Sequence, residues 1–308
     1  MMTKSQLVFK AVDILCYQMQ NHVHFPLIEQ VQDVAYSPEG GRATSGNLFF
    51  EKTRLASGEK LPILINIHGG GFVMGDKDYR ESLCEFYAHN GFFVFDINYR
   101  MPPEVVFPVL CNDCIDALNF LPTLAEDYPI DLDRIVVSGD SSGGYLTAYV
   151  AALAYDEKLR EAVGGHELKV KLAAIAPFCG IYDVETLLDG TLPSGLIQDT
   201  ASMLFGFHVN HGLSNLKDYK YIDYVAPSEY VNENWCPVFI AWSDSDLICV
   251  GQGAVMAEKL QKNCKVVGTY HCDGLLNNHC YHLNFHTREA KKCMAAFLRF
   301  MHQLKILP

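Results

Sequence analysis

The sequence lacks an excess of basic residues. Its 308 residues contain 24 lysines and arginines against 36 aspartates and glutamates, so the formal net charge is −12. Proteins that bind nucleic acids or anionic membrane surfaces need a basic surface, and we therefore expect neither kind of partner. A neutral small molecule fits this charge balance better.

Long apolar runs are also lacking. The segment 1–10 contains only short apolar stretches, which Lys10 and Asp13 interrupt, and no signal-peptide core of about 7–15 apolar residues is present. No run approaches the roughly 18 apolar residues of a membrane span. We therefore expect a cytoplasmic protein without stable membrane insertion. Its 11 cysteines are then reduced, mostly buried and free of disulfides.

Short apolar runs alternate with helical patterns along most of the chain. Hydrophobic residues make up 49% of the sequence and charged residues 19%, which is sufficient for a large buried core. Helical spacing is clearest over 106–121 and 290–304. Alternation of this kind predicts an α/β protein with a mostly parallel central sheet flanked by helices. The six predicted strands are 61–68, 92–97, 134–138, 172–176, 237–242 and 265–270.

Two segments depart from this alternation. Residues 1–29 are predicted to form a helix and a connector before any strand, and 182–230 is a long irregular insertion rich in glycine, aspartate and tyrosine. Long loops in compact domains usually serve as lids or binding segments. We therefore predict that both segments belong to a helical cap over a functional site. The alternative is that they are ordinary surface segments.

The hexapeptide GDSSGG at 139–144 contains the pattern G-x-S-x-G. It follows the predicted strand 134–138 and precedes a helical stretch over 142–155, which is the context in which this pattern presents a serine nucleophile. The tight turn strains the serine, and neighbours without side chains tolerate that strain. Ser141 is thus the candidate nucleophile of an acyl transfer. A trypsin-type GDSGG is excluded, because Ser142 intervenes and a double β-barrel would not alternate strands with helices.

A second glycine motif, HGGGF at 68–72, follows the predicted strand 61–68. Acyl transfer develops negative charge on a carbonyl oxygen, and preorganised backbone N–H groups commonly stabilise that oxyanion. Three successive glycines let the main chain approach a substrate closely. We interpret the motif as an oxyanion-binding loop, and the alternative is a glycine-rich turn without a chemical role.

Together these motifs resemble those of the hormone-sensitive-lipase-like family of α/β-hydrolases, which includes many bacterial esterases. The similarity runs through most of residues 60–300. The stretch HGGGF at 68–72 matches the family pattern H-G-G-G-[FW]. The stretch NYRMPPE at 98–104 is similar to Y-R-x-x-P-E and is continued by FP at 107–108 and by Asp113. The stretches DLDR at 131–134 and GDSSGG at 139–144 resemble D-x-x-R…G-D-S-A-G-G. Ser142 stands where the family usually has alanine.

The resemblance implies a single α/β-hydrolase domain over 1–308 with a cap formed by the N-terminal region and an insertion. It implies that the oxyanion is bound by the backbone amides of Gly70, Gly71 and Ser142. It requires no metal and no cofactor. A monomer and a homodimer formed through a sheet edge both remain open.

A serine nucleophile needs an imidazole base and a carboxylate that orients it, and in this fold the chain order is serine, acid, histidine. The predicted strand 237–242 is followed by two candidate acids, Asp244 and Asp246. The family segment reads G-x-x-D-P-L, and Asp246 occupies the position of its acid although the proline is absent. The resemblance therefore favours Asp246, and Asp244 is expected to be a solvated loop carboxylate.

Four histidines follow the last predicted strand: His271, His279, His282 and His286. The stretch HCYH at 279–282 resembles the family's H-G-F-H, which makes His279 the candidate base and His282 the alternative. Cysteine replaces the usual glycine after the base. His286 is expected to open the final helix as a surface or packing residue.

Metal and redox sites are not predicted. His282 and His286 are spaced as on a zinc-protease helix, but the glutamate of that motif is absent, and the cysteine and histidine spacing matches no structural zinc pattern. Cys111 and Cys114 form a C-x-x-C inside a helical pattern rather than at a strand-to-helix turn.

The sequence thus predicts a serine carboxylesterase that hydrolyses small-molecule esters with short to medium acyl chains. An amidase or formamidase, or carbon–carbon chemistry, would use the same three side chains. A small-molecule receptor without catalytic activity is the alternative outside the hydrolases, although such receptors typically lose the histidine.

Overall fold

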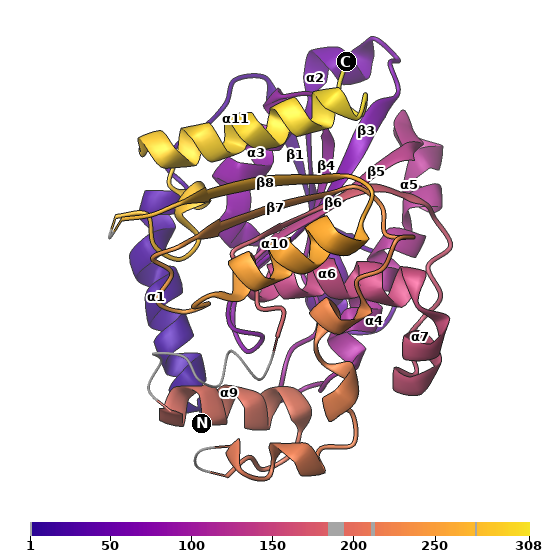
Figure 1. Cartoon of the computed structure of the whole chain (residues 1–308). Helices are drawn as coiled ribbons and strands as arrows, with labels where there is room; N and C mark the ends of the chain where they lie inside the picture. Colours follow the sequence, from indigo (N-terminus) through magenta and orange to yellow (C-terminus); the bar gives the residue numbers. More distant parts are fainter. Residues whose placement is uncertain (1, 184–193, 211–212, 275) are drawn as a thin grey trace.

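Eight strands form one sheet in the order β1-β2-β4-β3-β5-β6-β7-β8, with helices on both faces (Figure 1). The computed structural model describes residues 2–183, 194–210, 213–274 and 276–308. All six predicted strands are present, and the α/β-hydrolase fold is confirmed. The strands are β1 (Ile28–Ala35), β2 (Ser45–Glu51), β3 (Leu61–Ile67), β4 (Phe93–Ile97), β5 (Ile130–Asp140), β6 (Leu172–Phe178), β7 (Val238–Ser243) and β8 (Val267–Cys272).

The strands from β3 to β8 are parallel, whereas β1 and β2 form an antiparallel pair that extends the sheet beyond β4. The prediction of a helix and connector over 1–29 was therefore wrong at its end, because β1 begins at Ile28. β1 lies at the sheet edge, and most of its side chains are exposed and polar. An edge strand of this kind lacks the continuous apolar run that identified the central strands.

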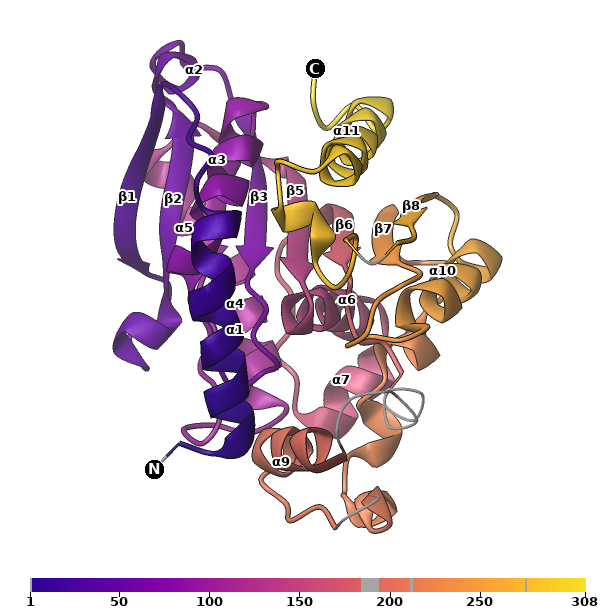
Figure 2. The same cartoon turned by 90° about the vertical axis from the view of Figure 1, so that its left-hand side faces the viewer.

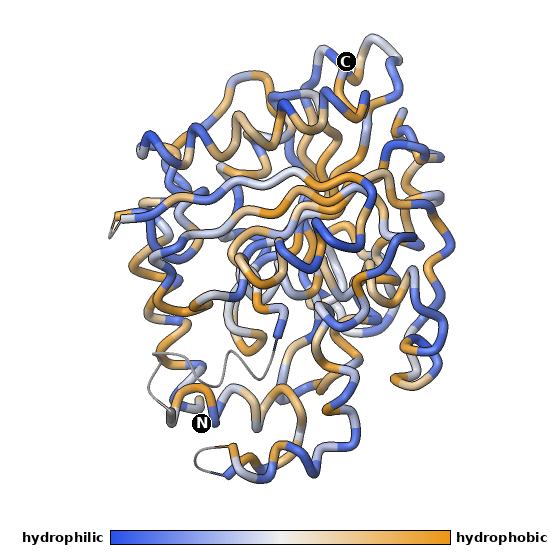
Figure 3. The backbone as a smooth tube through the Cα atoms, in the orientation of Figure 1, coloured by the Kyte–Doolittle hydropathy of each residue, from blue (hydrophilic) through white to orange (hydrophobic). Residues whose placement is uncertain are grey.

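Helices from different parts of the chain cover the two faces. On one face, α3 and α11 contribute Tyr87 and Phe297 to a core with Leu64 and Val136 of the sheet. On the other face, α4, α5, α6, α7 and α10 complete a larger core. Hydrophobic residues concentrate in the central strands between these layers (Figure 3). The helices are α2 (Lys52–Ala56), α3 (Glu81–His89), α4 (Val109–Asn119), α5 (Leu121–Asp127), α6 (Ser142–Tyr155), α7 (Glu157–Val163), α10 (Gln252–Asn263) and α11 (Arg288–Gln303).

Helix α6 has the bounds that its sequence predicted, 142–155, and every residue from 142 to 153 is buried. Its side chains are apolar on all sides because the helix packs against both the sheet and other helices. Helix α11 is amphipathic, as its predicted stripe indicated. It begins at Arg288 with Thr287 as its N-cap, so the prediction that His286 opens this helix was wrong. The Thr287 hydroxyl accepts the Ala290 amide proton, and that bond fixes the start of the helix.

Two further helices lie at the carboxyl ends of the parallel strands: α1 (Lys4–Gln20) and α9 (Ser194–Phe205). Figure 2 shows the N-terminal end of α1 beside α9. The contact includes the Ser5 amide and hydroxyl, which donate to Asp199 Oδ2 over 2.7 and 2.6 Å. Both helices come from the segments predicted to form a cap, although 184–193 and 211–212 lie outside the described residues. Among the helices described, none has the length and apolarity needed to cross a membrane.

Candidate active site

Ser141 lies at the sharp turn between β5 and α6, with backbone angles φ 55° and ψ −120°. A left-handed φ is unfavourable for a residue with a side chain, so neighbouring contacts must hold it. The Ser141 amide donates to the Phe178 carbonyl over 2.9 Å. The flanking glycines are required sterically, since a Cβ at Gly143 would lie 1.9 Å from the Ile67 carbonyl oxygen.

The structure brings the three predicted polar side chains together. His279 Nε2 lies 2.9 Å from Ser141 Oγ, and His279 Nδ1 lies 2.8 Å from Asp246 Oδ2. The other carboxylate oxygen of Asp246 accepts the amide protons of Ile248 and Cys249, each over 2.8 Å. Asp246 is only 4% exposed, so these bonds fix a buried carboxylate against the imidazole. The arrangement permits a proton to pass from the hydroxyl to the ring.

The alternative acid and base lie elsewhere. Asp244 has a side chain 43% exposed and accepts hydrogen bonds from Trp242 Nε1 over 2.8 Å and from His271 Nδ1 over 2.7 Å. His282 is fully buried, and its ring stacks on Phe178 with centroids 4.4 Å apart. Among the described residues, neither side chain is hydrogen-bonded to Ser141 or His279. Asp244 belongs to an exposed surface pair with His271, and His282 belongs to an aromatic cluster in the core.

Cys280 follows His279 with a left-handed φ of 54°. The usual glycine at this position in the resembling family adopts such a conformation without strain, and here a cysteine adopts it. Its thiol donates to Asp140 Oδ2 over 3.7 Å. The replacement therefore preserves the loop and adds a contact beneath the nucleophile.

Gly70 and Gly71 lie beside Ser141 with φ values of 137° and 62°. A Cβ at Gly70 would lie 1.9 Å from the Met74 carbonyl oxygen, and one at Gly71 would lie 2.3 Å from the Phe9 ring. Among the described residues, the amide N–H groups of these two glycines have no hydrogen-bond acceptor. Unpaired backbone donors beside a nucleophile are the arrangement that stabilises an oxyanion.

The other motif residues support this loop. His68 is fully buried, its Nδ1 lies 2.8 Å from the Gly69 carbonyl oxygen, and its ring stacks on Tyr99. The Tyr99 hydroxyl donates to the His68 carbonyl over 3.1 Å. Arg100 in turn forms two-point contacts with the buried Asp113, the shortest 2.6 Å. Burial lowers the pKa of His68, so this histidine has a structural role as a neutral ring.

Asp140, the residue before the nucleophile, forms a buried ion pair that the sequence did not reveal. Arg80 Nε and Nη2 donate to its two carboxylate oxygens, each over 2.7 Å, across a separation of 60 residues. Burial alone would raise the pKa of Asp140, but the Arg80 guanidinium outweighs it and lowers that pKa to about 2. No sequence motif marks Arg80. The only signal was a buried carboxylate in GDSSGG that needs a counter-charge.

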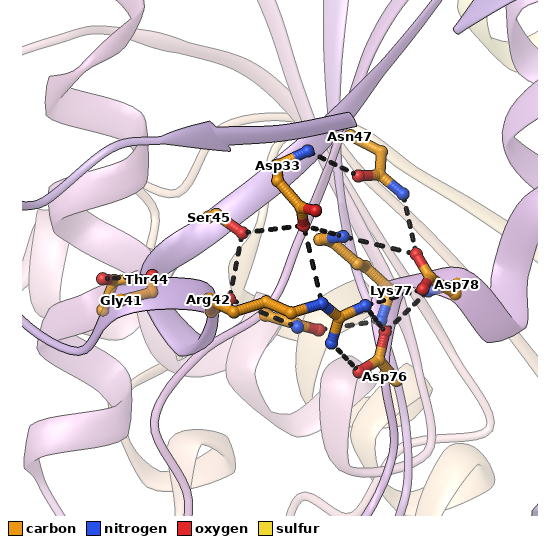
Figure 4. Close-up of polar contacts among 10 residues, drawn as sticks. Asp33, Gly41, Arg42, Thr44, Ser45, Asn47, Asp76, Lys77 and Asp78 are labelled. Carbon is orange, nitrogen blue, oxygen red and sulfur yellow. Dashed lines mark hydrogen bonds and ion pairs between the residues drawn. The ribbon is translucent and has the colours of Figure 1, made fainter. Parts of the chain in front are cut away.

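A second ion network, in which Arg42 is exposed and Lys77 is buried, lies near the same loop (Figure 4). Arg42 donates to Asp76 and Asp78, and Lys77 Nζ lies 2.8 Å from Asp33 Oδ1. The network joins the β1–β2 region to the segment that follows the glycine motif. Arg42 is 48% exposed, so water and salt screen its ion pairs.

Replacing Arg80 with methionine should lower the free energy of unfolding by about 3–5 kcal/mol, because it leaves Asp140 buried and unpaired. Replacing Arg42 with methionine is the matched control, and its cost should not exceed about 1 kcal/mol. Urea denaturation of both variants measures the difference. Equal losses would contradict this role for the buried pair.

Two pockets meet at Ser141. The first is almost wholly apolar and lies between the loop of Phe72, α6 and α9. Its wall includes Tyr145, Leu204 and Phe205. The second contains His279 and Gly70 and is bounded by one face of α1.

The pKa values within the site follow from its burial and charges. Burial opposes a charged imidazole, yet the pKa of His279 lies well above its ordinary value because of Cys249 and Asp246. Burial raises the pKa of Cys249 to about 11, so its thiol is neutral at neutral pH and Asp246 is the anion that favours the imidazolium. Burial would also raise the pKa of Asp246, but His279 and two backbone amides hold it below its ordinary value.

Two groups of described residues bring metal-ligating atoms within 4.8 Å of one another. One is Asp246, Cys249 and His279, whose carboxylate and imidazole already bond to each other. The other is the surface group His24, Glu81 and Glu85, in which His24 pairs with Glu85. The chemistry of either set requires no metal, and a metal-free site remains our prediction.

A family model described as BD-FAE matches residues 53–260 of the chain. Tuliposide A-converting enzyme 2 from Tulipa gesneriana is 35% identical over 133 residues, which are 39% of this chain and 34% of that protein. The chain thus spans about a third of the length of that relative. Probable carboxylesterase 3 from Arabidopsis thaliana is 24% identical over 279 residues, which are 88% of this chain and 86% of that protein.

Solved structures share the fold over nearly the whole chain. Esterase B from Lactobacillus rhamnosis, inhibited by a C6-C4 SN3 compound, has a TM-score of 0.84 at 20% sequence identity. The superposition covers 98% of this chain and 96% of that chain. At this identity the likeness establishes the fold alone.

Proposed function

The chain belongs to the BD-FAE family and is an α/β-hydrolase of the hormone-sensitive-lipase-like kind, and from this premise we propose that it is a serine carboxylesterase. The observation that carries the proposal is the continuous set of contacts from Ser141 through His279 to Asp246. The matching proteins named as esterases and carboxylesterases support the same reaction class.

In the proposed reaction, Ser141 Oγ attacks the carbonyl carbon of an ester while His279 Nε2 takes its proton. Asp246 holds the Nδ1 proton of the ring and stabilises the imidazolium that forms. His279 then gives the proton to the departing alkoxide, and an acyl-enzyme remains on Ser141. A water molecule repeats the sequence on the acyl-enzyme and releases the carboxylic acid.

The oxyanion of each tetrahedral intermediate would be bound by the backbone amides of Gly70, Gly71 and Ser142. The free N–H groups of the two glycines support this assignment, since they face no acceptor among the described residues. Ser142 contributes the first amide of α6, where the helix dipole also favours negative charge. Donors of this kind are each worth about 10²–10³ in rate.

The two pockets suggest how an ester is oriented. Its leaving oxygen must lie next to His279, which borders the second pocket and not the first. The acyl chain then enters the first pocket, whose apolar wall suits a short to medium aliphatic chain. Since α1 and α9 supply walls of both pockets, we propose that they form the cap of a single-domain hydrolase.

The test is hydrolysis of p-nitrophenyl butyrate from about pH 5 to about pH 9. The base acts only when neutral, and the raised pKa of His279 means that it keeps its proton above the ordinary value of 6.5. The acid limb of kcat/KM should therefore have its midpoint above 6.5. No turnover at any pH would reject the function, and a flat profile would reject His279 as the base.

A further inference from the structure

The second pocket is the place for the alcohol part of an ester, and this inference rests on the proposed function. His279 lies in its wall, and the group that protonates a leaving oxygen must contact it. Ser141 and Gly71 border both pockets, so an ester carbonyl held there directs its two substituents into different cavities. The side chains that line the second pocket therefore determine which alcohol part of an ester is preferred.

One face of α1 forms much of that wall. Phe9, Asp13, Cys16 and Gln20 border the pocket at helical spacings of three and four residues, which places them on one stripe. These four side chains are half-buried, whereas most of their neighbours on the helix are exposed. The stripe thus offers two polar groups, a carboxylate and an amide, to whatever occupies the pocket.

Asp13 lacks the partners that a buried carboxylate normally has. Its Oδ2 is buried and has no hydrogen-bond partner among the described residues. Arg80, the cation whose charge acts on Asp13, already donates two hydrogen bonds of 2.7 Å to Asp140. The Oδ1 of Asp13 accepts no hydrogen bond from the described residues either, and Asp13 borders the pocket, so a hydroxyl group is a neutral donor from which this carboxylate can accept a hydrogen bond.

The electrostatics of Asp13 agree with a neutral hydroxyl partner. Burial raises its pKa to about 6, against the opposing effect of Arg80. Near pH 7.5 the group is then mostly a carboxylate, which can only accept hydrogen bonds. A cationic ligand is not required, because Arg80 already lies nearby, and an anionic ligand would be repelled by Asp13 and Asp140.

We propose that this pocket recognises a polyhydroxylated alcohol, with Asp13 accepting a hydrogen bond from one of its hydroxyl groups. Gln20 lies farther along the same stripe and can bind a second hydroxyl. The preferred substrates are therefore short-chain acyl esters of glycerol-like or sugar-like alcohols, rather than esters of simple alkanols. Asp13 is a specificity residue and takes no part in the proton transfers.

The test compares glycerol 1-monobutyrate with propyl butyrate, which has the same carbon skeleton without the two free hydroxyls. The wild-type protein should favour the glycerol ester in kcat/KM by about 10-fold or more, the usual effect of a hydrogen bond to a charged group. Asp13→Leu should bring the ratio close to one. Asp13→Asn, which keeps an acceptor and the side-chain shape, should retain part of the preference.

p-Nitrophenyl butyrate serves as the third substrate because its leaving group carries no free hydroxyl. Its kcat/KM should change less than about 3-fold in Gln18→Leu, on the exposed face of α1, and the preference for the glycerol ester should persist in that variant. An unchanged glycerol-to-propyl ratio in Asp13→Leu would overturn the inference alone, as would an equal loss on all three esters. If the wild-type protein hydrolysed none of them, the proposed function itself would fall.

Discussion

Replacing Ser141 with alanine is expected to lower kcat for p-nitrophenyl butyrate by about 10⁴–10⁶-fold. The change removes the only atom that the proposed reaction acylates, and it leaves His279 and Asp246 bonded to each other. Alanine keeps the Cβ of serine, so the left-handed backbone at this position is no more strained than before. The variant should therefore fold with a nearly unchanged Tm.

A buried serine on β5, three residues before Ser141, provides the control. Ser138 contacts the Tyr87 hydroxyl over 3.2 Å and lies outside the proposed machinery. Ser138→Ala should keep its turnover, and a fluorophosphonate probe should label it as it labels the wild-type protein. Ser141→Ala should not be labelled. Retained hydrolysis by a folded Ser141→Ala protein would show that another group is the nucleophile.

Replacing Asp246 with asparagine is expected to reduce kcat by about 10⁴-fold with little change in the fold. The amide removes the negative charge that stabilises the imidazolium, and it can donate to Nδ1 and so favour the wrong tautomer of His279. The remaining side-chain oxygen can still accept the amide protons of Ile248 and Cys249. The acid limb of the pH profile should also move to lower pH, because the pKa of His279 loses its nearest anion.

Asp244→Asn is the matched control for this change. It alters the same residue type in the same loop, where Asp244 is exposed and bonded to His271 and Trp242. Its kcat should remain within about 3-fold of the wild-type value, as for most surface substitutions. Equal losses in both variants would mean that the loop, rather than the Asp246 charge, limits the reaction.

The central part of the fold was predictable because its strands are buried on both faces. Such strands, β3 to β7, read as continuous apolar runs and were located within a few residues of their observed bounds. The edge strand β8 was located equally well, although it is less buried. The antiparallel strands β1 and β2 were missed, since polar side chains interrupt the edge strand β1 and the first half of β2 contains Ser45 and Asn47. The helical prediction over 106–121 likewise ran past a break, because α4 ends at Asn119 and α5 begins at Leu121.

The site divides in the same way. Ser141, Gly70 and Gly71 stand in local motifs, where the backbone geometry dictates the residue type and the sequence therefore carries the signal. The choice of Asp246 over Asp244, and of His279 over His282, depended on family spacing. Arg80 and Asp13 stand in no sequence motif, because an ion pair and a pocket wall formed by distant segments have no fixed spacing.

Because of the Arg80–Asp140 pair, the protein should lose activity and folding stability at different pH values. Since the pKa of Asp140 is about 2 in the folded protein against 3.8 ordinarily, the pair contributes its full stability above about pH 4 and loses it only as the pH falls toward 2. His279 acquires its proton at much higher pH. Mild acid should therefore abolish hydrolytic activity while the protein stays folded. Returning the pH to neutral should restore the activity without any refolding.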